Sequence, residues 1–143
     1  MDERLILEAG RVKDGLRVLV TGGGSGIGAS VVDALRSAGA KVFVCDIDPS
    51  TSPDHVADIS QGQQVEEMFR AIERDLGGLD VLVNNVGIAG PAGLVDEIDP
   101  NDFDEVLRVN LSGTFRVTAC AVPLLRSADS GLIVNIASTA GIF

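Results

Sequence analysis

The sequence is poor in aromatic residues and in positive charge. Its 143 residues include no Tyr and no Trp, and its five aromatic side chains are all Phe. This scarcity argues against an aromatic-rich β-sandwich, whereas 17 glycines indicate tight turns and close backbone packing. There are 11 Lys and Arg against 21 Asp and Glu, and the resulting net charge of −10 repels phosphate backbones and anionic lipid surfaces. We therefore expect binding neither to nucleic acid nor to a membrane.

Cysteines and long hydrophobic runs are also scarce. Cys45 and Cys120 lie in apolar stretches without the spacing of a metal or redox motif, so we expect free thiols, as in a reducing cytosol, and no metal site. The N-terminal segment is charged and lacks the apolar core of a signal peptide. No window approaches about 18 uninterrupted apolar residues. These features predict a soluble, cytoplasmic protein.

Short apolar runs bounded by turn residues recur along the sequence and predict strands. Most of these runs are continuously apolar, which is typical of parallel strands covered by helices on both faces. The predicted strands lie at residues 17–20, 41–44, 54–57, 80–83 and 132–136.

The longer segments between the predicted strands show helical periodicity. Helices are predicted at 26–38 and from a capping box at Ser60 to Gly77, and a long one from Asp99-Pro100 to residue 126. The predicted order places a helix between every two successive strands. With right-handed crossovers, the elements predict an α/β fold, a doubly wound parallel sheet in strand order 3-2-1-4-5, in a single domain over 1–143. The long helix carries an apolar stripe of Phe103, Val106, Leu107, Leu111, Phe115 and Val122.

A glycine-rich turn, residues 21–28 (TGGGSGIG), joins the first strand to the first helix. Glycines permit positive φ and close approach of the backbone to a ligand, and the N–H groups at a helix start favour a pyrophosphate. A Walker A motif can be aligned through Gly23 and Gly28, but Ala29 stands where the lysine must be, which argues against phosphoryl transfer. The dinucleotide pattern G-x-G-x-x-G, started at Gly22, ends on Ile27. A merely tight strand–helix turn is the alternative.

Polar residues follow the other predicted strands. Asp46 comes about 20 residues after the glycine turn, where an acid would accept hydrogen bonds from a ribose. Because no Arg or Lys lies beside it or in the turn, we prefer NAD over NADP; a strand-end turn at 46–49 is the alternative. Asp58, Asn84-Asn85 and Ser138 occupy corresponding strand ends, where open α/β sheets bind ligands, although each of Asp58 and Asn84-Asn85 alone could be a cap or a turn former.

Asn110 lies in line with the apolar stripe of the long helix. Such an amide must find hydrogen-bonding partners. It is either a core asparagine satisfied by backbone or one that faces the site.

The sequence resembles the N-terminal part of a short-chain dehydrogenase/reductase, similar to bacterial ketoacyl-reductase-like members. The resemblance covers residues 14–143 and rests on six elements of sequence. They are Thr21-Gly22-x-x-x-Gly26-x-Gly28, Asp46, Asp58, Asn84-Asn85-x-Gly87, Asn110 and the surroundings of Ser138.

The resemblance implies an NAD(H)-dependent oxidoreductase that interconverts a secondary alcohol and a ketone. It implies that Ser138 hydrogen-bonds the substrate oxygen and that Asn110 supports a water relay to a catalytic lysine. Full-length members usually form homo-oligomers through the long helix and the one after it. The implied cofactor-binding residues are Gly22, Ser25, Gly26, Ile27, Gly28, Asp46, Asp58, Ile59, Asn85 and Gly87.

The sequence departs from the family pattern in two ways. Val86 replaces the usual alanine, which crowds the cofactor slightly. More seriously, the Tyr-x-x-x-Lys acid–base pair expected beyond Ser138 is absent, because the sequence contains no tyrosine. We therefore expect a domain truncated after its fifth strand and inactive by itself. The alternatives are a catalytically silent dinucleotide-binding or interaction module, or a fragment that pairs with a complementary chain.

Overall fold

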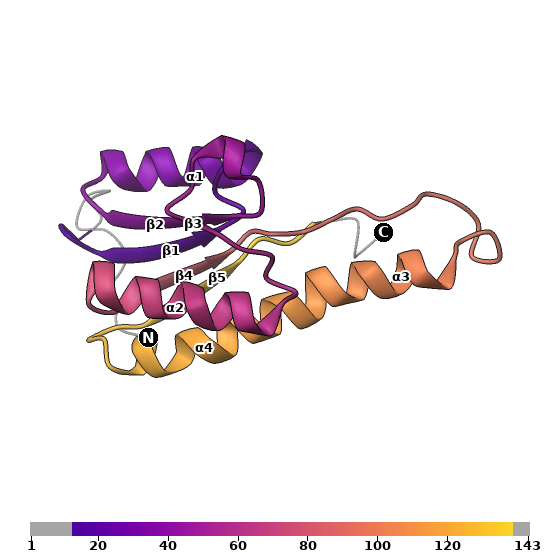
Figure 1. Cartoon of the computed structure of the whole chain (residues 1–143). Helices are drawn as coiled ribbons and strands as arrows, with labels where there is room; N and C mark the ends of the chain where they lie inside the picture. The colour runs from indigo at the N-terminus through magenta and orange to yellow at the C-terminus, as the bar shows by residue number, and fades with distance from the viewer. Residues whose placement is uncertain (1–12, 139–143) are drawn as a thin grey trace.

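The structure is a computed structural model and describes residues 13–138. Its strands form one parallel sheet in the order β3-β2-β1-β4-β5, as predicted. Helix α1 covers one face, α2 and α4 cover the other, and α3 projects beyond the sheet (Figure 1). The elements are β1 (Arg17–Thr21), α1 (Gly26–Ser37), β2 (Lys41–Asp46), η2 (Pro49–Thr51), β3 (His55–Val56), α2 (Gly62–Leu76), β4 (Val81–Asn84), α3 (Pro100–Leu107), η3 (Arg108–Gly113), α4 (Thr114–Arg126) and β5 (Leu132–Asn135).

The prediction of a helix between the second and third strands was wrong. Only the three-residue 3-10 turn η2 lies between β2 and β3. Pro49 and Pro53 fall within this short connection, and Ser52 adopts a left-handed φ of 53°. Proline restricts the backbone and removes an N–H donor, so the connection turns without continuing as a helix.

The long helix contains a π-helical segment, η3, between α3 and α4. Its predicted N-cap is confirmed, because Asp99 Oδ1 accepts a hydrogen bond from Asn101 N at 2.8 Å. The predicted apolar stripe does not face the core. Phe103, Leu107, Leu111 and Phe115 are exposed, while the buried side consists of Val109, Gly113, Val117, Ala121 and Leu125.

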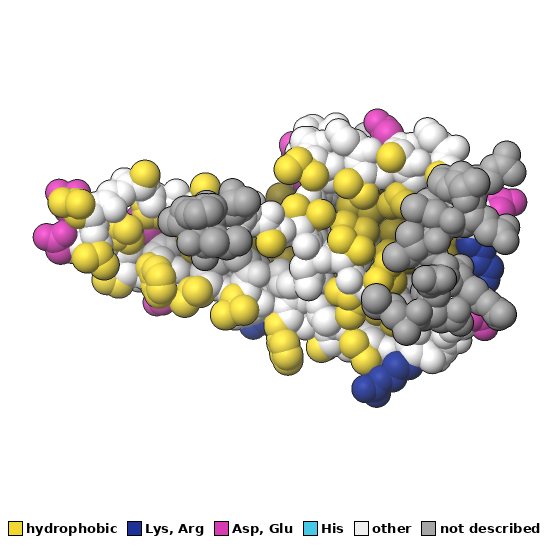
Figure 2. All heavy atoms as spheres, turned by 180° about the vertical axis from the view of Figure 1, so that it is seen from behind, with side chains coloured by type: hydrophobic (Ala, Val, Ile, Leu, Met, Phe, Trp, Pro, Cys, Tyr) yellow, Lys and Arg dark blue, Asp and Glu magenta, His cyan; other side chains and the backbone are white. Residues whose placement is uncertain are grey.

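Two causes explain the exposed stripe. Helix α3 extends beyond the sheet and has no layer beneath it (Figure 1). The π-helical segment also has a wider turn than an α-helix, which changes the residues that face the core. Seen from behind, hydrophobic side chains are spaced along the projecting arm, and a broad hydrophobic area occupies the middle of the molecule (Figure 2). The edge strand β5 is exposed along its whole length.

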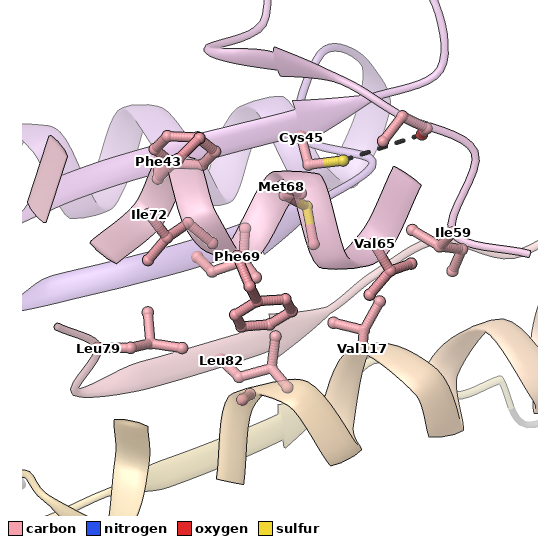
Figure 3. Close-up of a cluster of buried hydrophobic side chains, with 14 of the residues drawn as sticks. Phe43, Cys45, Ile59, Val65, Met68, Phe69, Ile72, Leu79, Leu82 and Val117 are labelled. Atoms are coloured by element: carbon pink, nitrogen blue, oxygen red, sulfur yellow. Dashed lines mark hydrogen bonds between the residues drawn. The ribbon is translucent and has the colours of Figure 1, made fainter. Parts of the chain in front are cut away.

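The strands contribute alternate residues to two cores. Leu19, Phe43, Cys45 and Leu82 pack with α2 and α4, whereas the valines between them pack with α1. Figure 3 shows the first cluster, in which Phe69 and Val65 of α2 lie next to Leu82 and Val117, while Met68 and Ile72 lie toward Cys45 and Phe43. Because both faces are covered, the central strands carry apolar residues at successive positions. Because the strands are parallel, their carboxyl ends lie at one edge of the sheet.

Candidate functional site

The strand ends border a cavity of about 370 Å³. Seven of the ten residues predicted to bind a cofactor line it. Gly26, Ile27 and Gly28 do not, and neither do Asn110 and Ser138. The predicted residues that line the cavity are Gly22, Ser25, Asp46, Asp58, Ile59, Asn85 and Gly87.

The glycine-rich turn brings backbone to the cavity wall. Gly22 has φ 63°, a conformation that glycine adopts without steric cost. A Cβ at Gly28 would overlap Gly22 O, so Gly28 keeps α1 against the turn. The Ser25 side chain forms no capping hydrogen bond at the start of α1. The first N–H groups of this helix are therefore suited to an anionic group.

Asp46 links the end of β2 to the glycine turn. The residue is buried, and its Oδ2 accepts a hydrogen bond from Gly24 N at 2.8 Å. Its Oδ1 accepts one from Asp48 N at 3.1 Å. These bonds fix the carboxylate at the cavity wall, and each oxygen keeps a lone pair that can accept a ligand hydroxyl.

Asp58 closes the turn that follows β3. Its Oδ1 accepts a hydrogen bond from Ser60 N at 2.9 Å, and its backbone N donates to Gln64 Oε1 at 2.8 Å. The predicted capping box at Ser60 was wrong, because α2 begins after Gln61 and has no side-chain cap there. Burial opposes ionisation of Asp58, but hydrogen bonds from Ser60 and Gln61 and the charge of Arg108 bring its pKa below its usual value.

The segment after β4 is held by side chains from both sides. Asn85 N donates to Thr21 Oγ1 at 3.1 Å, and Asn85 Nδ2 donates to Gly22 O at 2.9 Å. This joins the ends of β1 and β4 next to the cavity. Asn110 lies in η3, and both ends of its amide hydrogen-bond to the backbone of Ile88. Its contacts match the backbone-satisfied alternative, although Ile88 itself lines the cavity.

Ser138 follows β5 at the same edge of the sheet and is exposed. The preceding part of this edge is ordered by Asn84, whose Nδ2 donates to Asn135 Oδ1 at 2.9 Å and to Thr118 Oγ1 at 3.1 Å. Both the sheet register and this hydrogen bond pair Asn84 with Asn135. The Ser138 segment therefore leaves the sheet beside the residues that border the cavity.

The short chain dehydrogenase family matches residues 17–143 of this sequence. This chain belongs to the short-chain dehydrogenase family. It is 35% identical over 143 residues to D-beta-hydroxybutyrate dehydrogenase of Cupriavidus necator, covering 90% of this chain and 55% of the relative. It is 33% identical over 144 residues to a 3-oxoacyl-acyl-carrier-protein reductase of Thermotoga maritima, covering 91% and 58%.

The fold of this family member is also similar to that of solved structures. It matches NAD+-bound xylitol dehydrogenase with a TM-score of 0.83 at 28% identity, covering 90% of this chain and 55% of that chain. The chain thus spans about half the length of the relatives it matches. Among residues 13–138, no helix is long and apolar enough to cross a membrane.

Sequence reasoning missed several cavity residues of this family member. Cys45 and Val109 are apolar positions that gave no functional signal, and burial raises the pKa of the Cys45 thiol to about 12, so the thiol stays neutral. Glu105 and Arg108 are charged and three residues apart, which resembles an ordinary solvated helix face. Their spacing predicts an ion pair, but nothing local in the sequence places that pair at the cavity.

Proposed function

We propose that this chain binds NAD(H) for an oxidoreductase that interconverts a secondary alcohol and a ketone. The observation that carries the proposal is the buried Asp46 carboxylate, fixed by Gly24 N at the wall of a cavity of about 370 Å³. A carboxylate accepts hydrogen bonds from the hydroxyls of an unphosphorylated ribose and repels a 2′-phosphate. NAD therefore suits the site better than NADP.

The residues of the cavity fit the parts of a dinucleotide. The glycine turn and the start of α1 would bind the pyrophosphate through N–H groups. Asp46 would bind the adenosine ribose, and Asp58 with buried Ile59 would hold the adenine. Asn85 and Gly87 would lie under the cofactor, which supplies hydride transfer when bound. Ser25 and the exposed Ile27 would line the phosphates and the near ribose, and Gly28 would keep α1 against the turn.

Catalytic roles are proposed for Ser138 and Asn110. A serine hydroxyl can polarise the oxygen of a small ketone, and Asn110 would order the neighbouring loop and support proton movement. The sequence offers no tyrosine as the proton donor. We expect this chain alone to bind the cofactor without turnover. Catalytic activity would require the missing acid–base segment.

Two further properties belong to the same proposal. Free Cys45 and Cys120 suit the reducing cytoplasm. The exposed stripe of Phe103, Leu107, Leu111 and Phe115 suits self-association of the full-length protein through the long helix.

Titration of the chain with NADH and with NADPH by calorimetry tests the proposal. We expect NADH to bind at least about tenfold more tightly, because a buried carboxylate opposes the extra phosphate. The double variant Asp46→Ala, Ile47→Arg should reverse this preference, since Ile47 is exposed beside Asp46 on the cavity wall. Ile47→Arg alone is the matched control. If wild type bound neither cofactor, the proposal would be wrong. Binding without ketone reduction in the full-length protein would favour the silent module.

A further inference from the structure

Arg108 joins two walls of the cavity. Its Nε and Nη2 donate to the two carboxylate oxygens of Glu105, at 2.8 Å and 2.5 Å. Its Nη1 donates to Ser60 Oγ and lies 3.7 Å from Asp58 Oδ2. Among residues 13–138, Arg108 is the only Lys or Arg that lines the cavity. The guanidinium therefore ties the turn after β3 to the long helix.

Arg108 belongs to a helical segment that contacts two loops of the cavity. Arg108 is the first residue of the π-helical segment η3, and Asn110 in the same segment pairs with Ile88 after β4. At the other end of η3, a Cβ on Gly113 would approach Ile59 Cγ1 to 2.9 Å. One short segment thus holds the loops after β3 and after β4, and π-helical segments of this kind often occur at functional sites.

We propose that Arg108 is a positioning residue that sets the preference of this site for adenine over a purine without the 6-amino group. The proposal rests on the proposed binding of NAD(H) and extends it to a residue that would not itself contact the base. Arg108 acts by fixing the Asp58 turn at the end of the cavity.

The physical reason lies in the hydrogen bonding of the two purines. The 6-amino group of adenine donates a hydrogen bond to an ionised carboxylate. Hypoxanthine has a carbonyl oxygen at that position, and the carboxylate repels this oxygen. Discrimination therefore needs an Asp58 that is both ionised and fixed. An aspartate is ionised at neutral pH with or without a cationic partner, so the contribution of Arg108 is positional: its hydrogen bond to Ser60 and its approach to Asp58 Oδ2 fix the turn. The bonds of Asp58 to Ser60 N and Gln64 are local and remain without Arg108.

Binding of NADH and of its hypoxanthine analogue to the chain, measured by calorimetry, tests the role of Arg108. For wild type we expect NADH to bind about tenfold more tightly than the analogue, the value of one hydrogen bond to a charged group. For Arg108→Met we expect the ratio to fall to about two, with affinity for the analogue changed by less than about threefold. Ser60→Ala removes the hydroxyl that accepts the hydrogen bond from Arg108 and should also lower the ratio of the two affinities. This variant tests the proposal if Arg108→Met does not fold.

Two controls separate positioning from a general effect. Arg70→Met removes the same charge from an exposed pair with Glu66 on α2 and should leave the ratio unchanged. In an Asp58→Asn background, Arg108→Met should have no further effect on the ratio, because both residues act through one carboxylate. Equal losses of affinity for both dinucleotides, or an unchanged ratio, would overturn the proposal. If wild type bound NADH and the hypoxanthine analogue equally well, the role of Arg108 would be overturned, but the proposed binding of NAD(H) would not. Wild type that bound neither would overturn the proposed function as well.

Discussion

The side-chain amide of Asn110 forms two hydrogen bonds with a single residue, Ile88. Its Oδ1 accepts from Ile88 N at 2.8 Å, and its Nδ2 donates to Ile88 O at 2.9 Å. The amide thus satisfies both polar backbone groups of a residue that lines the cavity. A loop without strand partners is ordered in this way by a helix that lies beside it.

Replacement of Asn110 by Ala should loosen this loop. We expect the free energy of unfolding to fall by about 1–2 kcal/mol, because two hydrogen bonds are lost at a partly exposed site. Amide hydrogen exchange at Ile88 should accelerate, and NADH should bind more weakly. Asn101→Ala is the control, because the Asn101 side chain donates to Asp99 Oδ1 at the exposed start of α3, away from the cavity. Unchanged exchange at Ile88 would refute the role of Asn110 in holding the loop.

Gly28 should tolerate no side chain. A Cβ there would overlap Gly22 O and press on Asn85 Nδ2, so Gly28→Ala must shift α1 away from the turn. We expect destabilisation by about 1–3 kcal/mol, as for other overpacked sites, together with loss of NADH binding. Gly62→Ala adds a methyl group to open space at the start of α2 and should change stability by less than about 1 kcal/mol. Urea unfolding and calorimetry would measure both, and cofactor binding by Gly28→Ala at wild-type affinity would contradict this account.

The sequence was sufficient to predict that Asp46, Asp58 and Asn85 lie at the same edge of the sheet, where all three line the cavity. Parallel strands place their carboxyl ends at one edge, so the strand assignments alone brought these side chains together. The prediction needed the strand order and direction, not exact bounds. The weak third strand shows this, since β3 comprises only His55–Val56 and Asp58 still reaches the cavity.

The contribution of Arg108 could not be predicted in the same way. It depends on the face that the long helix presents after η3 begins, and a periodicity of 3.6 residues does not hold through a π-helical segment. The apolar stripe was mispredicted because two sets of residues on this helix share a four-residue spacing. Phe103, Leu107, Leu111 and Phe115 are exposed, whereas the set that runs from Val109 to Leu125 is buried.

The exposed stripe should mediate self-association of the full-length protein. Phe115 and Leu111 are 70% and 65% exposed, which is costly for large apolar side chains unless a partner covers them. Leu111→Glu, Phe115→Glu should therefore shift the protein toward monomer in sedimentation velocity experiments. Val95→Glu, which changes a 90% exposed side chain in the loop before α3, is the control. An unchanged oligomer in the double variant would exclude this helix as the interface.

The ion pair of Arg17 with Asp80 should make stability depend on pH. Arg17 Nη2 and Nε donate to Asp80 Oδ1 and Oδ2 at 2.7 Å and 2.9 Å, and these bonds lower the pKa of Asp80. Because the folded pKa lies below the unfolded value of about 4, the stabilisation is present above pH 4 and is lost as pH falls through the folded pKa.

Arg17→Met should therefore reduce the free energy of unfolding by about 2 kcal/mol near pH 7, since a partly buried carboxylate loses its charged partner. The difference from wild type should narrow as pH falls below about 4. Urea unfolding at a series of pH values measures both effects. Arg74→Met, which breaks an exposed pair with Asp75, should have a much smaller effect. If the difference between Arg17→Met and wild type stayed constant with pH, the contribution of Arg17 would be packing of its side chain and not its charge.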